Sequence, residues 1–219
     1  MAESHPVIAI GNEYIYKKAI VLTDSLGKNI RYINTANIKS KGGCTIDRLT
    51  QDIRYLSLNN YDCVALLIGT CDISPKFVWD DYIKQRRQGI KHPILPEHSC
   101  ITVDLFLHKY NNLISAIEQQ NPTIGIVILS ILPRKFHFSV NLTRITDINK
   151  ALKKFCSGIH NCKFVKAYQK FTFEGKLKEN LFQEDGIHLS FDGNHILKEI
   201  LASEVGEVLK QKSKQQAKH

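Results

Sequence analysis

The chain lacks the segments that would place it in a membrane or on a secretory route. No stretch approaches the roughly 18 consecutive apolar residues of a membrane span, and charged residues interrupt residues 1–18, where a signal peptide needs a continuous apolar run. There is also no internal repeat and no low-complexity linker. With 219 residues, of which 43% are hydrophobic, we expect one domain with a sizeable core, located inside the cell in the cytoplasm or nucleus.

The cysteine pattern also lacks the signature of a metal site or a disulfide framework. No CxxC pair occurs, and no histidine lies at a spacing typical of zinc ligands. His92 and His98 are too loosely placed to form a metal site. We therefore expect free thiols and no bound metal. The six cysteines are Cys44, Cys63, Cys71, Cys100, Cys156 and Cys162.

Charge of one sign is in excess but is not concentrated in one motif. Lys and Arg number 30 against 21 Asp and Glu, which gives a formal net charge of +9. Such an excess favours acidic partners such as nucleic acid or an anionic membrane. Its densest part, residues 211–219, is expected to be a basic tail that is either solvated or in non-specific contact with phosphate.

What is present is an alternation of short apolar runs with segments of helical periodicity. Alternating strands and helices predict right-handed crossovers and a parallel sheet that is covered on both faces. We expect an α/β fold with five mostly parallel strands in a three-layer α/β/α sandwich over 18–210, preceded by an N-terminal extension, 1–17. The expected strands are 18–23, 63–69 and 124–132, with weaker candidates at 30–35 and 162–168. The expected helices are 46–56, 103–120, 143–159 and 193–212.

One long connection, residues 74–100, has no clean periodicity. It contains three prolines, two histidines and the sole tryptophan, Trp79. A connection of this length in a compact domain is often functional. The segment is either a lid over the site or a plain surface excursion.

Parallel sheets of this kind place their sites beyond the carboxyl ends of the strands. Ser25 follows the first strand in the sequence TDSL. Near the C-terminus, DGIH places Asp185 three residues before His188, and a carboxylate there can hold the imidazole and leave its second nitrogen free to act as a base. Taken singly, a serine after a strand is more often a helix cap. In this order, the three residues indicate a nucleophile, a base and the carboxylate that orients the base.

Four short blocks in chain order resemble those of the SGNH hydrolases, also called GDSL-type esterases and lipases. They read TDSL with Ser25, GGCTIDRL with Gly43, GTCD with Gly69 and Asp72, and DGIH near the end. The resemblance runs from about residue 18 to 210. It implies a flavodoxin-like fold and hydrolysis of acyl esters without a metal or organic cofactor.

By this resemblance, Ser25 attacks the carbonyl carbon, His188 carries the proton and Asp185 orients His188. The backbone N–H groups of Ser25 and Gly43 would hold the oxyanion. Cys71 stands where the family has an asparagine that supplies a third donor. A thiol is a weak donor, and losing one such donor costs about 10²–10³ in turnover.

Several readings of the residues around this third block stay open. Cys71 either packs as a small hydrophobe or has a redox or nucleophilic role, which would need a lowered pKa. Thr70 is a candidate replacement donor, and Asp72 is expected to make a structural hydrogen bond. Arg134 and Lys135 either meet an anionic acyl or phosphate group or form a solvated pair.

The later segments 128–156 and 166–193 also resemble SGNH domains of animal retroelement open reading frames, including first-frame proteins of some LINE-type retrotransposons. That resemblance would agree with the excess of Lys and Arg over Asp and Glu, and it implies that the protein acts near lipid or nucleoprotein. The leading hypothesis is a serine esterase for small acyl or acetyl esters. The alternatives are an SGNH-fold binding module with weak or no activity, for which nucleic acid is one candidate ligand, and acyl transfer to an acceptor alcohol. The sequence does not indicate an oligomeric state.

Overall fold

The computed structural model describes most of the region in which the four blocks lie. The described residues are 9–10, 13–14, 18–73, 84–85, 87–90, 101–134 and 142–217. Most of the predicted lid 74–100 therefore lies outside the described residues, as do Trp79, His92, His98, Cys100 and Lys135.

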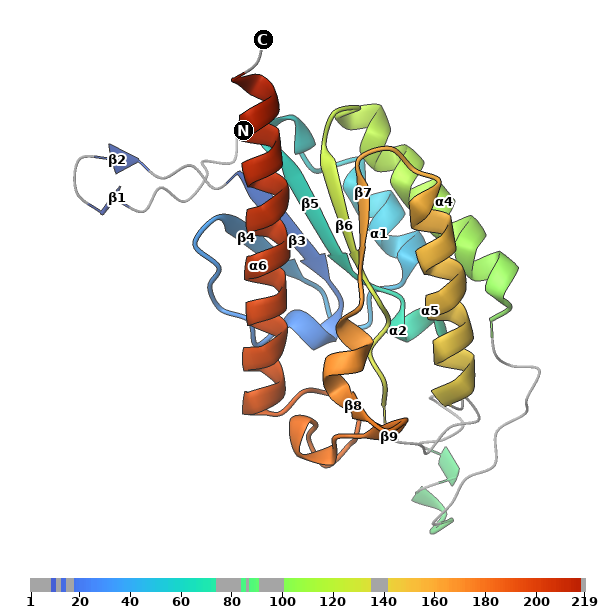
Figure 1. Cartoon of the computed structure of the whole chain (residues 1–219). Helices are drawn as coiled ribbons and strands as arrows, with labels where there is room; N and C mark the ends of the chain where they lie inside the picture. Colours follow the sequence, from blue (N-terminus) through green and yellow to red (C-terminus); the bar gives the residue numbers. More distant parts are fainter. Residues whose placement is uncertain are drawn as a thin grey trace.

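A five-stranded parallel sheet forms the middle layer (Figure 1). Its spatial order is β4-β3-β5-β6-β7, and all four neighbouring pairs are parallel. This is the flavodoxin-like order, in which the first strand of the sheet lies between the second and the third. The predicted fold class is confirmed. The strands are β3 (Ala19–Thr23), β4 (Ala36–Ser40), β5 (Cys63–Leu67), β6 (Gly125–Leu129) and β7 (Cys162–Val165).

The central strands are apolar throughout because both of their faces are buried. In β3, Ile20 and Leu22 pack into one hydrophobic cluster, and Ala19 and Val21 pack into the other. Side chains alternate between the faces of a strand, so a strand inside two clusters reads as a continuous apolar run.

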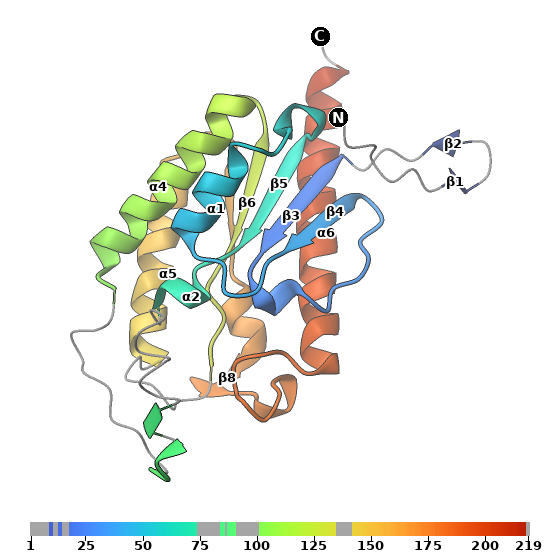
Figure 2. The same ribbon diagram turned by 180° about the vertical axis from the view of Figure 1, so that it is seen from behind.

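Helices cover the two faces of the sheet. Buried side chains of α1, α4 and α5 belong to the first cluster, and those of α6 belong to the second. Figures 1 and 2 show α6 on one side of the sheet, and α1, α4 and α5 on the other. The helices are α1 (Ile46–Ile53), α2 (Thr70–Ile73), α4 (Val103–Gln120), α5 (Leu142–Ser157) and α6 (Phe191–Gln216).

Short elements complete the described chain. Two small antiparallel pairs are β1 (Ala9–Ile10) with β2 (Glu13–Tyr14), and β8 (Thr172–Phe173) with β9 (Lys176–Leu177). The 3-10 turns are η1 (Ser25–Gly27), η2 (Leu58–Asn60), η4 (Ala167–Phe171) and η5 (Glu179–Leu181). No helix among the described residues has both the length and the apolar character needed to cross a membrane.

The position of one strand and the end of one helix differ from the expectation. The second strand of the sheet is 36–40, and the apolar residues of 30–35 instead lie in a loop in which Ile30 and Ile33 are buried. The true strand is at the sheet edge and is half exposed, so its sequence ANIKS is mostly polar. The final helix also continues through Gln216, beyond the point where a tail was expected, because the Lys and Gln residues there are good helix formers.

Candidate active site

Three of the predicted site residues follow adjacent strands at the carboxyl edge of the sheet. Ser25 follows β3, Gly43 lies between β4 and α1, and Cys71 lies in α2 directly after β5. Because β3 is between β4 and β5, the three segments meet at the point where the strand order reverses. Ligands of open α/β sheets bind at this point.

The turn that carries Ser25 is capped by the residue before it. The Asp24 carboxylate accepts the Leu26 N–H at 2.9 Å and is the N-cap of η1, so Ser25 is the first residue of that turn. The Asp24 backbone is tied to both neighbouring strands, since its N–H donates to Leu67 and its carbonyl accepts from the Ser40 hydroxyl. Ser25 itself therefore does not serve as the cap.

The hydroxyl of Ser25 meets the predicted base. Ser25 Oγ lies 3.2 Å from His188 Nε2, although the two residues are 163 positions apart. On the other side of the ring, His188 Nδ1 lies 2.6 Å from Asp185 Oδ2. These distances form a continuous path of hydrogen bonds from hydroxyl to imidazole to carboxylate, as a serine nucleophile needs.

The loop that carries His188 is fixed by its own backbone. Asp185 Oδ1 accepts the N–H groups of Ile187 and His188, both at 2.9 Å. The His188 carbonyl accepts the Gln183 N–H at 2.8 Å, and Gly186 supplies the positive φ of +64° that closes the loop. Partial burial opposes the charge of Asp185, but the hydrogen bonds from His188 and from these N–H groups lower the pKa of its carboxyl.

Two backbone N–H groups are available where the oxyanion is expected. Neither the Ser25 N–H nor the Gly43 N–H makes a hydrogen bond to another described residue. The Lys41 N–H donates to the Thr23 carbonyl at 3.0 Å, which ties the loop before Gly43 to the strand before Ser25. Gly43 has a φ of +66°, a conformation that favours glycine.

In the third block, the space around Gly69 admits no side chain. Cys71, two residues later, stands where the resemblance implied an amide side chain. A Cβ on Gly69 would approach Phe106 at 2.8 Å and Ile131 at 2.9 Å. Cys71 is half-buried, and burial, with the nearby charges of Asp24 and Asp72, raises the pKa of its thiol to about 12. The thiol is therefore neutral near pH 7, which disfavours the nucleophilic reading of Cys71.

Solved structures share this architecture. A GDSL-like lipase from Bacteroides thetaiotaomicron superposes with a TM-score of 0.66 at 16% identity, covering 88% of this chain and 89% of that one. A carbohydrate esterase family 3 protein from Talaromyces cellulolyticus gives a TM-score of 0.62 at 12% identity, covering 88% and 98%. A catalytic mutant of an acetylxylan esterase from Geobacillus stearothermophilus gives 0.57 at 15%, covering 87% and 94%.

This chain has the SGNH hydrolase fold. No protein-family model and no curated protein sequence matches it. The likeness is thus one of structure, and the identities are too low to carry residue roles from one protein to the other.

In this SGNH fold, the residue before the candidate nucleophile is a buried carboxylic acid. Asp24 is fully buried, and burial raises the pKa of its carboxyl to about 6 against opposing contributions from the Leu26 N–H and from Thr70. Its second oxygen, Oδ2, has no hydrogen-bond partner among the described residues. Sequence reasoning did not find this feature, although an Asp directly after a buried apolar strand is a signal for it.

Two further residues lie close to the third block. Asp72 makes the structural hydrogen bond expected of it, because its Oδ2 accepts the Ile46 N–H at 2.9 Å. Arg134 is only 4% exposed, and its Nη1 lies 3.5 Å from the Thr70 carbonyl. The solvated reading of Arg134 was therefore wrong, because the chain after β6 turns its side chain in beside α2.

The described residues contain no cluster of three or more His, Cys, Asp or Glu side chains arranged to hold a metal ion. The cysteines placed by the structure are free: Cys44, Cys63, Cys71, Cys156 and Cys162.

Proposed function

We propose that the protein is a serine ester hydrolase that acts on small acyl or acetyl esters. The observation that carries the proposal is the path of hydrogen bonds from Ser25 through His188 to Asp185 at the carboxyl edge of the sheet. Support comes also from the solved structures of the same fold, which are named as lipases and esterases.

The mechanism follows from the geometry. His188 Nε2 removes the proton of Ser25 Oγ as that oxygen attacks the carbonyl carbon, and the same nitrogen then protonates the leaving alcohol. Asp185 holds the Nδ1 proton and stabilises the imidazolium that forms. Water repeats the sequence on the acyl-enzyme, with His188 again as base, and releases the acid.

The developing oxyanion would be held by the N–H groups of Ser25 and Gly43. Preorganised donors of this kind often supply the largest single contribution to acyl transfer. Cys71 would add at most a weak S–H donor. We therefore expect turnover that is measurable but slow relative to an enzyme with three strong donors.

The test is hydrolysis of p-nitrophenyl acetate and butyrate by the parent protein and by Ser25→Ala. We expect turnover that Ser25→Ala reduces at least about 10³-fold, and that rises with pH because a general base must be unprotonated to act. Ser157→Ala is the matched control, because the Ser157 hydroxyl only donates to the Lys154 carbonyl within α5. Equal turnover in Ser25→Ala, or a flat pH profile, would contradict the proposal.

A binding role without turnover is the second candidate, favoured by the neutral thiol in place of an amide and by the formal charge of +9. It predicts no turnover in the parent or in Cys71→Asn, together with affinity for an anionic polymer that falls steeply with salt. Absence of binding to single- and double-stranded nucleic acid at about 50 mM salt would remove the nucleic-acid form of this candidate. Nucleic acid, anionic membrane and the retroelement setting all stay predictions.

A further inference from the structure

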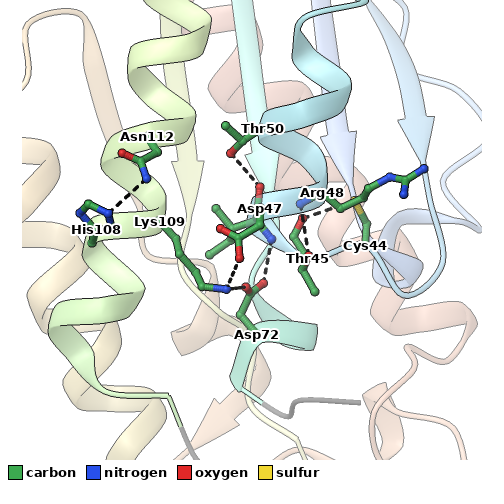
Figure 3. A network of polar contacts seen from close by, with 10 residues as sticks. Cys44, Thr45, Asp47, Arg48, Thr50, Asp72, His108, Lys109 and Asn112 are labelled. Atoms are coloured by element: carbon green, nitrogen blue, oxygen red, sulfur yellow. Dashed lines mark hydrogen bonds and ion pairs between the residues drawn. The ribbon is translucent and has the colours of Figure 1, made fainter. Parts of the chain in front are cut away.

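A partly buried ionic network joins the two segments that flank the oxyanion position (Figure 3). The side chain of Asp72 is fully buried, and its two oxygens have different partners. Oδ2 accepts the backbone N–H of Ile46 at 2.9 Å, and Oδ1 accepts from Lys109 Nζ at 3.2 Å. Lys109 Nζ also donates to Asp47 Oδ2 at 2.5 Å. Three helices, α1, α2 and α4, are thereby held at one point.

The two ends of this network lie next to the proposed oxyanion donors. Ile46 is the first residue of α1 and comes three residues after Gly43, whereas Asp72 directly follows Cys71. The hydrogen bond between Ile46 and Asp72 therefore fixes the distance between the second block and the third.

The loop that carries Gly43 is exposed at its glycines and held at its two ends, and Cys44, the next residue, is buried and donates its N–H to the Lys41 carbonyl at 3.2 Å. Gly42 and Gly43 are exposed, and a Cβ added to either would meet no atom within 4 Å. On the N-terminal side the loop is held by the Lys41 N–H, which donates to Thr23. On the C-terminal side it is held by the first turn of α1, whose N–H groups are capped by Thr45 and Asp72.

Filling this space with charged side chains carries a desolvation penalty that apolar side chains would not carry. Burial raises the pKa of the Asp72 carboxyl, and the Ile46 N–H and Lys109 oppose that effect. Burial lowers the pKa of Lys109, but the bonds to Asp47 and Asp72 outweigh it and raise the pKa overall. Apolar side chains of similar volume often replace such buried pairs without loss of stability. A charge-assisted hydrogen bond, unlike an apolar contact, holds two particular atoms at a short, set separation.

We infer that Asp72 and Lys109 are positioning residues for the oxyanion hole, which act by holding the Gly43 N–H in place relative to Ser25. This inference rests on the proposed ester hydrolysis. Neither residue touches the reacting atoms. Their effect should appear in kcat, because the interaction with the oxyanion exists only in the transition state.

The experiment compares Lys109→Met, Lys109→Arg and Asp72→Asn with the parent on p-nitrophenyl acetate. We expect kcat to fall by about 10-fold to 100-fold in Lys109→Met and Asp72→Asn, since small misplacements of catalytic groups cost rate on this scale. KM should change less than about twofold because ground-state binding is kept. Lys109→Arg should recover most of kcat, since Arg retains the charge.

Lys163→Met is the matched control. Lys163 also bridges two carboxylates, with Nζ at 2.6 Å from Glu204 and 2.5 Å from Glu207, but it joins β7 to α6 at a distance along the chain from every site segment. It should leave kcat unchanged. A loss of kcat in Lys163→Met equal to that in Lys109→Met would overturn the inference, as would an unchanged kcat in Lys109→Met.

Amide hydrogen exchange gives a readout that does not depend on turnover. Residues 42–46 should exchange faster in Lys109→Met and in Asp72→Asn than in the parent, and Lys163→Met should leave them unchanged. If the parent shows no turnover that depends on Ser25, the proposed function fails. The positioning role is then judged by exchange alone: faster exchange supports the link to the Gly43 loop, and unchanged exchange overturns it.

Discussion

The candidate site consists of two halves that keep their carboxylates in opposite surroundings. In the base half, formed by His188 and Asp185, the Asp185 side chain is 42% exposed and the pKa of its carboxyl is lowered. In the oxyanion half, which includes Gly43 and Cys71, Asp24 and Asp72 are buried and the pKa of each carboxyl is raised. The ionised carboxylate of the base half therefore keeps much of its hydration, whereas the carboxyls of the oxyanion half carry a desolvation penalty when they are ionised.

The two halves depend on the fold in different ways. The base half is a local loop, in which the hydrogen bonds of Asp185 span two or three residues and the bond from Gln183 to the His188 carbonyl spans five. The oxyanion half is joined by contacts that span 26, 37 and 62 residues. Substitutions in the base half should therefore change the chemistry with little change in stability, and substitutions in the oxyanion half should change both.

The largest effect is expected in the base half. Asp185→Asn should reduce turnover by about 10⁴-fold, because an amide cannot hold the Nδ1 proton that leaves Nε2 free to act as a base. The Asn oxygen can still accept the N–H groups of Ile187 and His188, so the midpoint of urea unfolding should fall only slightly, by the small contribution of a partly exposed carboxylate whose pKa is lowered. A large loss of stability in this variant would show that the loop is part of the core, and would contradict the distinction between the two halves of the site.

The second effect concerns the missing amide. Cys71→Asn should raise turnover, by up to about 10²–10³-fold, if its side chain supplies the third oxyanion donor. Cys71→Ala is the control, because it removes the thiol without adding a donor, and it should leave turnover near that of the parent. Equal rates for the Asn and Ala variants would show that position 71 does not face the oxyanion.

The third effect is a pH dependence of stability that comes from Asp24. Its folded pKa of about 6 lies above the ordinary aspartate value of 3.8, so the folded state binds the proton more tightly than the unfolded state does. The contribution of Asp24 to stability is therefore greatest below about pH 4 and is lost as the pH rises to about 6. Since one pKa unit is about 1.4 kcal/mol, the loss is about 3 kcal/mol.

Asp24→Asn removes this titration and keeps an oxygen that can accept the Leu26 N–H. The unfolding free energies of the variant and the parent are measured in urea at pH 4 and at pH 7.5. Relative to the parent, the variant should be more stable at pH 7.5 than it is at pH 4. Asp104→Asn, at an exposed position in the first turn of α4, is the control. Parallel pH profiles for Asp24→Asn and the parent would contradict the account of this carboxyl.

The fold was predictable from the sequence where strands are buried on both faces. The runs around β3, β5 and β6 are continuously apolar, and the periodicity of 103–120 matches α4. The edge strand β4 was missed because an edge strand with a half-exposed surface has a mixed sequence, and the neighbouring Ile30 and Ile33 are buried in a loop.

The same distinction applies to the site. The contact between Asp185 and His188 was predictable because the two residues are three positions apart in one loop. The link from Asp72 to Lys109 was not found, since Lys109 is one of several polar residues on an amphipathic helix and only the packing of α4 on α1 brings it to Asp72. The burial of Arg134 was missed for a similar reason, because it depends on how the chain after β6 lies against α2.

The central claim is that Ser25 is a nucleophile activated by His188, and covalent labelling tests it most directly. The protein is treated with a fluorophosphonate ester, and the modified residue is identified by mass spectrometry of its peptides. We predict one adduct, on Ser25, which is absent in Ser25→Ala and forms much more slowly in His188→Ala. Absence of an adduct, or an adduct elsewhere while Ser25 stays unmodified, would contradict the account.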